Sequence, residues 1–451
     1  MKRTVCFLMA LVMGICLLFS GLSATAAELR YEYPAEGEDA IQSPSALLLY
    51  MGVKAEQDVY LYEKEADKPF EPGALMRVAM AGYAMQLIRE QNLDMQTATG
   101  VYTLELFNHY VAGTGLHVAL MNFGETWTLN DLLTVSTIQT AADCAVTLAA
   151  TLSGSPEAFV EGLNQYAQAL GCTNSYFTNV AGVNDGQQKM SARDVATFTR
   201  HAMQYSEIRD MLELTQWTVK PVSGGATRSW PSSCDFIRQS SSVFYTYALG
   251  GKTGGTPSEM GLMAFGGNNG YEYMAIVMGA PRKQENGDLT NIVYADARRL
   301  IRWGLLDFRY EKLAHKNEPV GRIKVQDSTE RSSITLVPTR DLTTVLGPDV
   351  KREDITRRVV TTQEECVAPV KQGDVLGTLE VYFNNELVGT VPVAAAENAS
   401  RNFLYAAWCD VRNVLFSGWT LAFVLLLVAL AVGYVVLNIR YNRKKQRRWK
   451  S

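Results

Sequence analysis

The stretch of this chain that most clearly could do chemistry is the run from Gly250 to Thr256, which reads Gly-Gly-Lys-Thr-Gly-Gly-Thr. It sets an ammonium group and a hydroxyl among glycines, on a segment predicted to be a strand. Glycines in a strand let another backbone or a ligand approach closely, and Lys252 and Thr253 can hold a carboxylate between them. A tripeptide as short as Lys-Thr-Gly carries little weight alone, so its meaning depends on the elements that position it.

Predicted strands surround this stretch. Ser45 to Tyr50 and Asp58 to Tyr62 form two strands early in the chain, and Val243 to Leu249 leads into Lys252. Met260 to Phe265 and Tyr271 to Met278 follow it as two strands joined by a Gly-Asn-Asn-Gly turn. We therefore expect a sheet that carries Lys252.

Helices are predicted between the first strands and the Lys252 stretch. Ala74 to Ile88 is an apolar helix with few charges and is expected to be buried, with positions 74 and 77 one turn apart on the same face. Leu104 to Phe123 is expected to be strand and loop. Further helices are signalled by a cap at Asn130, by Thr140 to Asp143, by Ser155-Pro156 and by a cap at Ser191. This mixture predicts an α+β enzyme-like domain that ends near Lys312.

The sequence changes character after Lys312. Short alternating strands with turn signals predict a small all-β domain over residues 313–396. A hairpin is expected in which one strand carries Leu379, Val381 and Phe383 and the other carries Leu387 and Val391. A linker over residues 397–413 then leads to residues 414–437, which contain no charge and are long enough to span a bilayer as a helix.

The two ends of the chain predict where it works. Lys2 and Arg3 precede an apolar run that ends in Ala24-Thr25-Ala26, as in a secretory signal peptide over residues 1–26; an uncleaved anchor is the alternative. The tail at 438–451 carries seven cations and no acid, which places it in the cytoplasm. We therefore expect a single-pass membrane protein whose main domains, from residue 27 onward, face outward.

Composition narrows the possible partners. Of 42 Lys and Arg residues, two lie in the signal and seven in the tail, so 33 remain against 46 acids, a net charge near -13. This acidity argues against a nucleic-acid partner. Neither the four histidines nor the five cysteines left after the signal show metal-ligand spacing, so we predict no metal, no cofactor and isolated buried thiols. These cysteines are Cys144, Cys172, Cys234, Cys366 and Cys409.

Taken in order, these segments resemble the low-molecular-mass penicillin-binding proteins of the D-alanyl-D-alanine carboxypeptidase family, peptidase family S11. The resemblance runs through Ser45-Ala-Leu-Leu-Leu, Leu61-Tyr-Glu-Lys, Asn130-Asp-Leu-Leu, Ala142-Asp-Cys-Ala-Val-Thr-Leu-Ala, Gly171-Cys-Thr-Asn-Ser-Tyr-Phe-Thr-Asn, Ser191-Ala-Arg-Asp, Gly251-Lys-Thr-Gly and Ala368-Pro-Val-Lys-Gln-Gly-Asp. It implies a penicillin-binding serine-peptidase domain over residues 27–312, then the β domain and the membrane helix. It also implies a place at the bacterial cell wall and peptidoglycan stem peptides as ligands.

The chemistry of this family rests on three motifs, Ser-x-x-Lys, Ser-x-Asn and Lys-Thr-Gly. The first falls on Ala74 and Arg77, where a methyl group replaces the nucleophile and a guanidinium that stays protonated replaces the base. The second falls on Thr140-Ala141-Ala142, which keeps a hydroxyl and loses the amide. The resemblance therefore implies no intact catalytic set at Ala74, Arg77, Thr140 and Ala142. It implies a substrate-binding site at Lys252, Thr253 and Gly254, the one complete motif.

Two main hypotheses follow for the function. The first is a pseudoenzyme that binds a peptidoglycan stem peptide or a partner wall enzyme, because ground-state affinity can survive the loss of a nucleophile. The alternative is a divergent, active serine-type carboxypeptidase that uses another hydroxyl. The candidates are Thr134, Ser136 and Thr140, for which the sequence offers no adjacent lysine base. A domain that merely spaces and presents the protein is a third. The sequence leaves open whether Arg77 reaches into the cleft, and it predicts that Ala74 lies beside Lys252.

Overall fold

The computed structural model describes residues 33, 40–52, 55, 58–282, 291–347, 350–383, 386–415 and 418–448. The signal peptide predicted over residues 1–26 lies outside these ranges. Contacts divide the chain into two compact units. Of the described residues, those within Glu28–Tyr310 and Val345–Val350 form one unit, and those within Glu311–Thr344 and Lys351–Ser451 form the other. Each unit is described by itself below.

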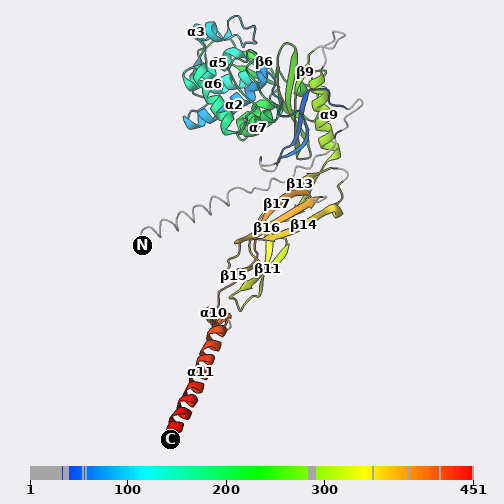
Figure 1. Ribbon diagram of the computed structural model, residues 1–451. Helices are drawn as coiled ribbons and strands as arrows, with labels where there is room; N and C mark the ends of the chain where they lie inside the picture. The colour runs from blue at the N-terminus through cyan, green and yellow to red at the C-terminus, as the bar shows by residue number, and fades with distance from the viewer. Residues whose placement is uncertain are drawn as a thin grey trace. The chain divides into compact units, whose positions relative to one another are not determined.

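The larger unit is built on a five-stranded antiparallel sheet with the strand order β2-β1-β9-β8-β7 (Figure 1). Its strands are β1 (Ser45–Tyr50), β2 (Val59–Lys64), β7 (Ala248–Gly255), β8 (Glu259–Asn268) and β9 (Tyr271–Pro281). The predicted strands are thus confirmed, except that the lead-in from Val243 is wrong before Ala248. Turns closed by hydrogen bonds from Phe244 N to Ser241 O and from Ala248 N to Tyr245 O replace it.

Helices cover both faces of this sheet. Figure 1 shows α2, α5, α6 and α7 on one side and α9 on the other. The bounds are η2 (Gly73–Met76), α2 (Arg77–Glu90), α4 (Leu129–Ile138), α5 (Ala142–Ser153), α6 (Pro156–Ala169), α7 (Ala192–Ala202), α8 (Ser206–Glu213) and α9 (Ile292–Asp307). Because side chains alternate along a strand, Leu47 and Leu49 of β1 join the core under the helical layer, whereas Leu48 joins the core under α9.

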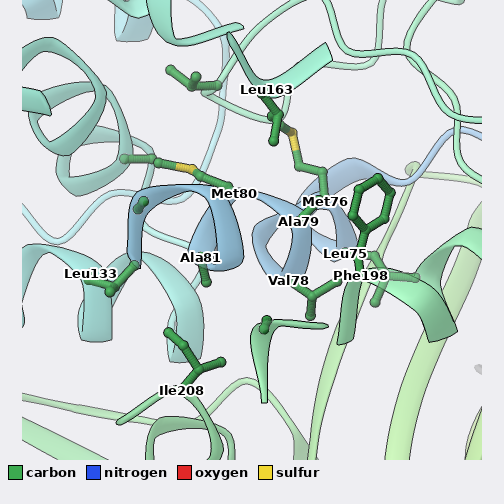
Figure 2. Packing of buried hydrophobic residues seen from close by; sticks show 14 of the residues in the cluster. Leu75, Met76, Val78, Ala79, Met80, Ala81, Leu133, Leu163, Phe198 and Ile208 are labelled. Carbon is green, nitrogen blue, oxygen red and sulfur yellow. The ribbon is translucent and has the colours of Figure 1, made fainter. Parts of the chain in front are cut away.

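Helix α2 lies at the centre of the helical layer, as the sequence predicted. After Arg77, its first two turns are apolar on every side rather than along one stripe, which is typical of a fully buried helix. Figure 2 shows Val78, Ala79 and Met80 among side chains from neighbouring helices, which include Leu133 of α4 and Phe198 of α7. The helix is entered through the 3-10 turn η2, which begins at Gly73 with φ +49°.

The helices begin at the predicted capping residues, with one exception. Ser155 caps α6 and Ser191 caps α7, as predicted, each accepting a hydrogen bond from a backbone N–H three residues on. The predicted cap at Asn130 is wrong. Thr128 caps α4 instead, because its hydroxyl accepts from Asp131 N at 3.0 Å and Asn130 lies inside the first turn.

The segment from Leu104 to Phe123 is helical in its first part, so the prediction of strand and loop is wrong there. Thr103 caps this helical part by accepting from Leu106 N at 3.2 Å. The short elements of the unit are β3 (Thr99–Val101), α3 (Leu104–Leu106), the π-helical turn η3 (Phe107–Val111), β4 (Thr126–Thr128), β5 (Gln216–Val219), β6 (Arg228–Pro231) and η4 (Asp235–Ile237).

The smaller unit contains a six-stranded sheet with the order β14-β16-β17-β12-β11-β15, as expected of a small β domain. Its strands are β11 (Gly321–Gln326), β12 (Ser333–Pro338), β14 (Ile355–Thr361), β15 (Glu365–Val367), β16 (Val375–Phe383) and β17 (Glu386–Ala395). The predicted hairpin is confirmed, since Leu379 pairs with Val391 across β16 and β17. The remaining short element of this unit is η5 (Arg352–Asp354), and β10 (Arg309–Ala314) and β13 (Leu342–Leu346) each have residues in both units.

Two helices end the described chain, α10 (Phe403–Leu415) and α11 (Gly418–Arg448). The linker predicted over residues 397–413 is therefore helical from Phe403. The membrane span predicted over residues 414–437 runs from the end of α10 into α11 and includes residues 416–417, which lie outside the described ranges. Among the described residues, no helix combines the length and the apolar character that crossing a membrane requires.

Candidate functional site

The segment that opens helix α2 packs backbone against backbone on strand β7. Gly255 N donates to Pro72 O at 2.8 Å. A Cβ atom on Gly254 would lie 2.1 Å from Leu75 N, and one on Gly73 would lie 2.0 Å from Gly255 O. Only glycine permits this approach. The glycines after Lys252 therefore bring the Ala74 turn onto the Lys252 strand, as the sequence predicted.

Lys252 is a buried cation on β7. Its side chain is 1% exposed, and its ammonium donates to Ser233 Oγ at 3.1 Å. Thr253 beside it donates to Ser233 O at 3.3 Å. Burial, followed by the nearby charge of Arg77, lowers the pKa of Lys252 to about 7. The amine can therefore gain or lose its proton near neutral pH, and a bound anion would favour the charged form.

Arg77 begins helix α2 and is also buried, at 1% exposure. Its guanidinium donates from Nη1 to Val180 O and from Nη2 to Ala181 O, the latter at 2.7 Å. Burial lowers the pKa of Arg77 to about 10, so the group stays charged at neutral pH. Arg77 therefore does not project into a cleft, and among the described residues it forms no ion pair with an acid. It fastens the loop that carries Val180 and Ala181.

Thr140 and Ala142, the residues predicted to match the family's second motif, lie where α4 gives way to α5. Thr140 has φ +67°, a left-handed conformation that is unusual for a β-branched residue. Ala142 begins α5 as a fully buried residue, and its N–H donates to His117 O at 2.8 Å. Thr140 thus offers a hydroxyl just before α5, whereas Ala142 places a methyl group inside the core.

A cavity of about 540 Å³ opens where these elements meet. Ala74 and Thr140 line it. Lys252, Thr253, Gly254, Arg77 and Ala142 are not among its lining residues. The rest of its wall consists of Thr114, Gly115, Leu116, His117, Ala181, Gly182, Val183, Asn184, Gly255, Thr256, Pro257 and Arg282. Strand β7 therefore reaches the cavity just after the Lys-Thr-Gly motif, at Gly255.

Two polar side chains on this wall were not found from the sequence. Arg282 donates from Nε to Thr256 O at 2.6 Å. Asn184 donates from Nδ2 to Gly255 O at 3.3 Å, and its Oδ1 is buried with no hydrogen-bond partner among the described atoms. Both residues lie far from Lys252 in the sequence, and no local pattern marks them. An arginine and an unpaired amide oxygen beside Gly255 suit a ligand that carries both an anion and an N–H donor.

Polar side chains hold the cavity loops in place. Asn179 Oδ1 accepts from Gly182 N at 2.8 Å and from Val183 N at 2.9 Å, which fixes the loop fastened by Arg77. Asp143 on α5 accepts from Ala119 N at 2.9 Å and anchors the loop that follows His117. A half-buried amide and a buried carboxyl group thus position two walls of the cavity.

The other hydroxyls proposed from the sequence do not meet an amine. Thr134 and Ser136 are buried in α4, and Ser136 donates to Leu133 O at 2.9 Å. The hydroxyl that does lie beside a lysine is that of Ser233, which sequence reasoning missed because it belongs to no family motif.

Four of the five cysteines are free and buried, as predicted, and the side chain of Cys409 lies outside the described atoms. The described residues include no cluster of His, Cys, Asp and Glu suited to a metal ion.

Comparisons with known proteins cover nearly the whole chain. A family profile described as D-alanyl-D-alanine carboxypeptidase, peptidase S11, matches residues 35–282, and one described as penicillin-binding protein 5, C-terminal domain, matches residues 308–401. The D-alanyl-D-alanine carboxypeptidase DacF of Bacillus subtilis is 24% identical over 403 residues, which are 89% of this chain and 95% of that protein. DacC of Escherichia coli is 23% identical over 418 residues, 89% of this chain and 97% of that protein.

Solved structures show the same fold. Penicillin-binding protein 5 from Haemophilus influenzae superposes with a TM-score of 0.66 at 18% identity, covering 82% of this chain and 100% of that one. The peptidoglycan synthesis regulatory factor PBP3 from Streptococcus pneumoniae gives 0.62 at 16% identity, covering 80% and 100%. The predicted architecture, a penicillin-binding serine-peptidase-like α+β domain followed by a β domain, is confirmed.

Proposed function

Since this chain belongs to the D-alanyl-D-alanine carboxypeptidase family, we propose that it works at the bacterial cell wall as a pseudoenzyme that binds peptidoglycan stem peptides. The observation that carries the proposal is the state of Arg77. At the position of the family's lysine base, it is buried, charged and hydrogen-bonded to two backbone carbonyls. It can therefore neither take up a proton nor reach a ligand.

The nucleophile position supports the same conclusion. Ala74 lines the cavity with a methyl group, so a peptide carbonyl bound there meets no attacking atom. Removing the nucleophile from a catalytic unit of this kind costs on the order of a millionfold in rate, whereas ground-state binding can persist. The chain would then hold a stem peptide without cutting it.

The charges around the cavity support an anionic, peptide-like ligand. Lys252 is buried on β7, three residues before Gly255 of the wall, Arg282 lines the cavity, and Asn184 presents an unpaired amide oxygen beside Gly255. A terminal carboxylate would be attracted by the two cations, and the amide oxygen can accept the N–H of a peptide bond. A D-Ala-D-Ala end carries both groups.

Calorimetry on the purified full-length chain tests this proposal. A synthetic stem pentapeptide ending in D-Ala-D-Ala should bind, and the same peptide with an amidated C-terminus should bind at least ~10-fold more weakly. Lys252→Met should weaken the binding of the peptide with the free C-terminus by a similar factor. Lys220→Met, a matched change at an exposed lysine, should leave its affinity unchanged.

Three outcomes would overturn the proposal. Equal affinity for the free and the amidated peptide would show that the chain has no site for the terminal carboxylate. Release of D-alanine with many turnovers would establish the alternative, a divergent serine-type carboxypeptidase. A chain that ignores the peptides and instead co-purifies with a peptidoglycan-synthesising enzyme would have a partner-binding function.

We also propose, on sequence grounds, that residues 414–437 anchor the protein in the cell membrane with the basic tail at 438–451 inside. The uncharged run and the cationic tail support this proposal. Alkaline carbonate extraction of membranes should leave the full chain in the pellet and release a chain that ends at residue 400. Release of both would contradict it.

A further inference from the structure

A second cavity, of about 460 Å³, lies within the smaller unit. It opens where the last three residues of β12 pair with the last three of β17, around the pair Val337 and Ala394. A volume of this order suits a small-molecule ligand. The cavity is lined by Lys316, Asn317, Val337, Pro338, Thr339, Gln372, Gly373, Ala394, Ala395 and Ala396.

Two turns form the walls of this cavity, and backbone hydrogen bonds tie each of them to a strand. Asn317 has φ +64°, and its N–H donates to Pro338 O at the end of β12, at 3.1 Å. Gly373 has φ +95°, and its N–H donates to Ala395 O at the end of β17, at 2.9 Å. A ligand therefore meets walls that are already in place, so little ordering is lost on binding.

Polar residues line the cavity above an apolar base. Val337, Pro338, Ala394 and Ala395 are buried, and Ala396 is half-buried. The polar residues of the lining are Lys316, Asn317, Thr339 and Gln372.

These four polar side chains form no hydrogen bond or ion pair with any described residue. Polar side chains nearby that do not line the cavity are engaged. Lys312 Nζ pairs with Asp341 at 2.8 Å, and Asn398 Oδ1 accepts from Gln372 N at 2.7 Å. The side chains on the cavity are therefore the ones left for a ligand.

The backbone at the cavity does not suit an added peptide strand. Thr339 N donates to Pro392 O at 3.0 Å, and Ala395 N donates to Asp374 O at 2.9 Å. The N–H groups of Asn317 and Gly373 are paired as well. Since a peptide that extends a sheet needs unpaired backbone groups, recognition here depends on side chains.

The charges at the cavity do not suit a strongly anionic ligand. Of the described residues that line it, Lys316 is the one cation, and none is an acid or an aromatic. Asp341 lies beside this lysine in the fold, because its Oδ1 accepts from Lys316 N at 2.8 Å. A carboxylate so close offsets much of the attraction that one ammonium exerts on an anion.

The remaining chemistry is that of a neutral ligand rich in hydroxyls. Asn317 and Gln372 carry carboxamides, which donate and accept at once, as a sugar hydroxyl does. Thr339 adds a hydroxyl, and Lys316 adds a donor. The methyl groups of Ala394 to Ala396 offer a surface for a small apolar group, such as the methyl of an acetamido substituent.

We propose that this cavity binds an N-acetylated sugar of a glycan strand. The proposal goes beyond the proposed function by giving the smaller unit a ligand, and it rests on that function only for the place where the ligand is met, the cell wall. The two units then bind two parts of one polymer, the sugar chain and its stem peptide.

Saturation-transfer NMR on the full-length chain in detergent micelles tests the proposal. The probe is N,N′-diacetylchitobiose, and its acetamido methyl signals should show saturable transfer from the protein. Cellobiose, which has hydroxyls in place of the acetamido groups, should bind at least ~10-fold more weakly, because it lacks both the methyl groups and the amides.

Two variants locate the sugar on the protein. Gln372→Ala and Asn317→Gly should each weaken binding of the disaccharide roughly 3- to 10-fold, the usual contribution of one or two neutral hydrogen bonds. Glycine is chosen at position 317 because it adopts a left-handed φ without strain. Gln363→Ala is the matched control, since Gln363 is exposed in the same unit and does not line the cavity. All three variants should bind the stem pentapeptide like the wild type.

This proposal and the peptide-binding function fail separately. A chain that binds the pentapeptide but shows no saturable transfer to the disaccharide overturns the sugar site alone. Disaccharide binding that Gln372→Ala and Asn317→Gly leave unchanged overturns it too, and equal affinity for cellobiose overturns the assignment to an N-acetylated sugar. Weaker pentapeptide binding by Gln372→Ala would make the cavity a peptide site instead. A chain that binds the disaccharide in this cavity and ignores the pentapeptide overturns the peptide-binding function alone.

Discussion

The guanidinium of Arg77 donates a hydrogen bond of 2.7 Å to the backbone carbonyl of Ala181. With a second bond to Val180 O, it ties the first turn of α2 to the loop that forms one wall of the cavity. Arg77, which the sequence pattern matches to the family's proton-accepting lysine, therefore helps to build the site. Arg77 is therefore part of the scaffold of the site, and the contribution of its two hydrogen bonds to the stability of the fold can be measured.

Arg77→Met should lower the free energy of unfolding by about 1–3 kcal/mol. Two buried carbonyls lose their donor, which costs roughly 1–3 kcal/mol each, and this loss is partly offset because the variant no longer buries a charge. Arg89→Met at the exposed end of the same helix is the control. Its ion pair with Glu207 is exposed, so the change should stay within about 1 kcal/mol. Urea denaturation measures both, and an Arg77→Met variant as stable as the wild type would contradict the scaffold role.

Restoring the family's motif should restore its chemistry. The double variant Ala74→Ser/Arg77→Lys should gain a penicillin adduct at position 74, because a serine and a lysine one turn apart form a nucleophile and its base. Either single change alone should remain unlabelled, since each lacks one partner. Labelling gels and peptide mapping provide the measurement. A double variant that folds and stays unlabelled would mean that more than these two side chains has diverged.

Lys252 makes the stability of the fold depend on pH. Its pKa is about 7 in the folded chain and near 10.5 when unfolded, so between these values the unfolded chain binds more protons and stability rises with pH. Lys252→Met removes this contribution to the pH dependence of stability. The variant should be more stable than the wild type at pH 6, and its advantage should shrink by up to about 1.4 kcal/mol per pH unit above pH 7. Urea titrations from pH 6 to pH 9 measure the difference, and a pH-independent gap would contradict the lowered pKa.

The glycine of the Lys-Thr-Gly motif has a steric role that can be isolated. Gly254→Ala would place its Cβ 2.1 Å from Leu75 N, a backbone atom that cannot rotate away, and should cost about 2–4 kcal/mol. Gly261, its partner in the β7–β8 register, is the matched control, because a Cβ there meets its nearest neighbours at 3.4 Å. Gly261→Ala should change stability by less than about 1 kcal/mol. Equal effects in thermal melts would show that the contact with Leu75 does not constrain the site.

Much of the fold could be predicted because local patterns carry it. The strands at Ser45 and Tyr271, the buried helix after Ala74 and the caps at Ser155 and Ser191 follow from hydrophobic period and cap chemistry, which act over a few residues. The predictions are wrong where hydrogen bonds, rather than the local composition of the sequence, decide the backbone conformation. An apolar segment before Ala248 forms turns, and the helical start of the Leu104 segment depends on a cap at Thr103.

The sequence by itself determined the family, and it predicts a methyl group at Ala74 and a guanidinium at Arg77 in place of two catalytic groups, beside a complete Lys-Thr-Gly at Lys252. These follow from residue type and order along the chain. Only the tertiary structure decided that Arg77 turns onto backbone carbonyls, and that the hydroxyl next to Lys252 belongs to Ser233. The physical reason is distance: hydrogen bonds form between atoms about 3 Å apart, and the folding of η2, α4 and β7 onto one another sets which atoms those are.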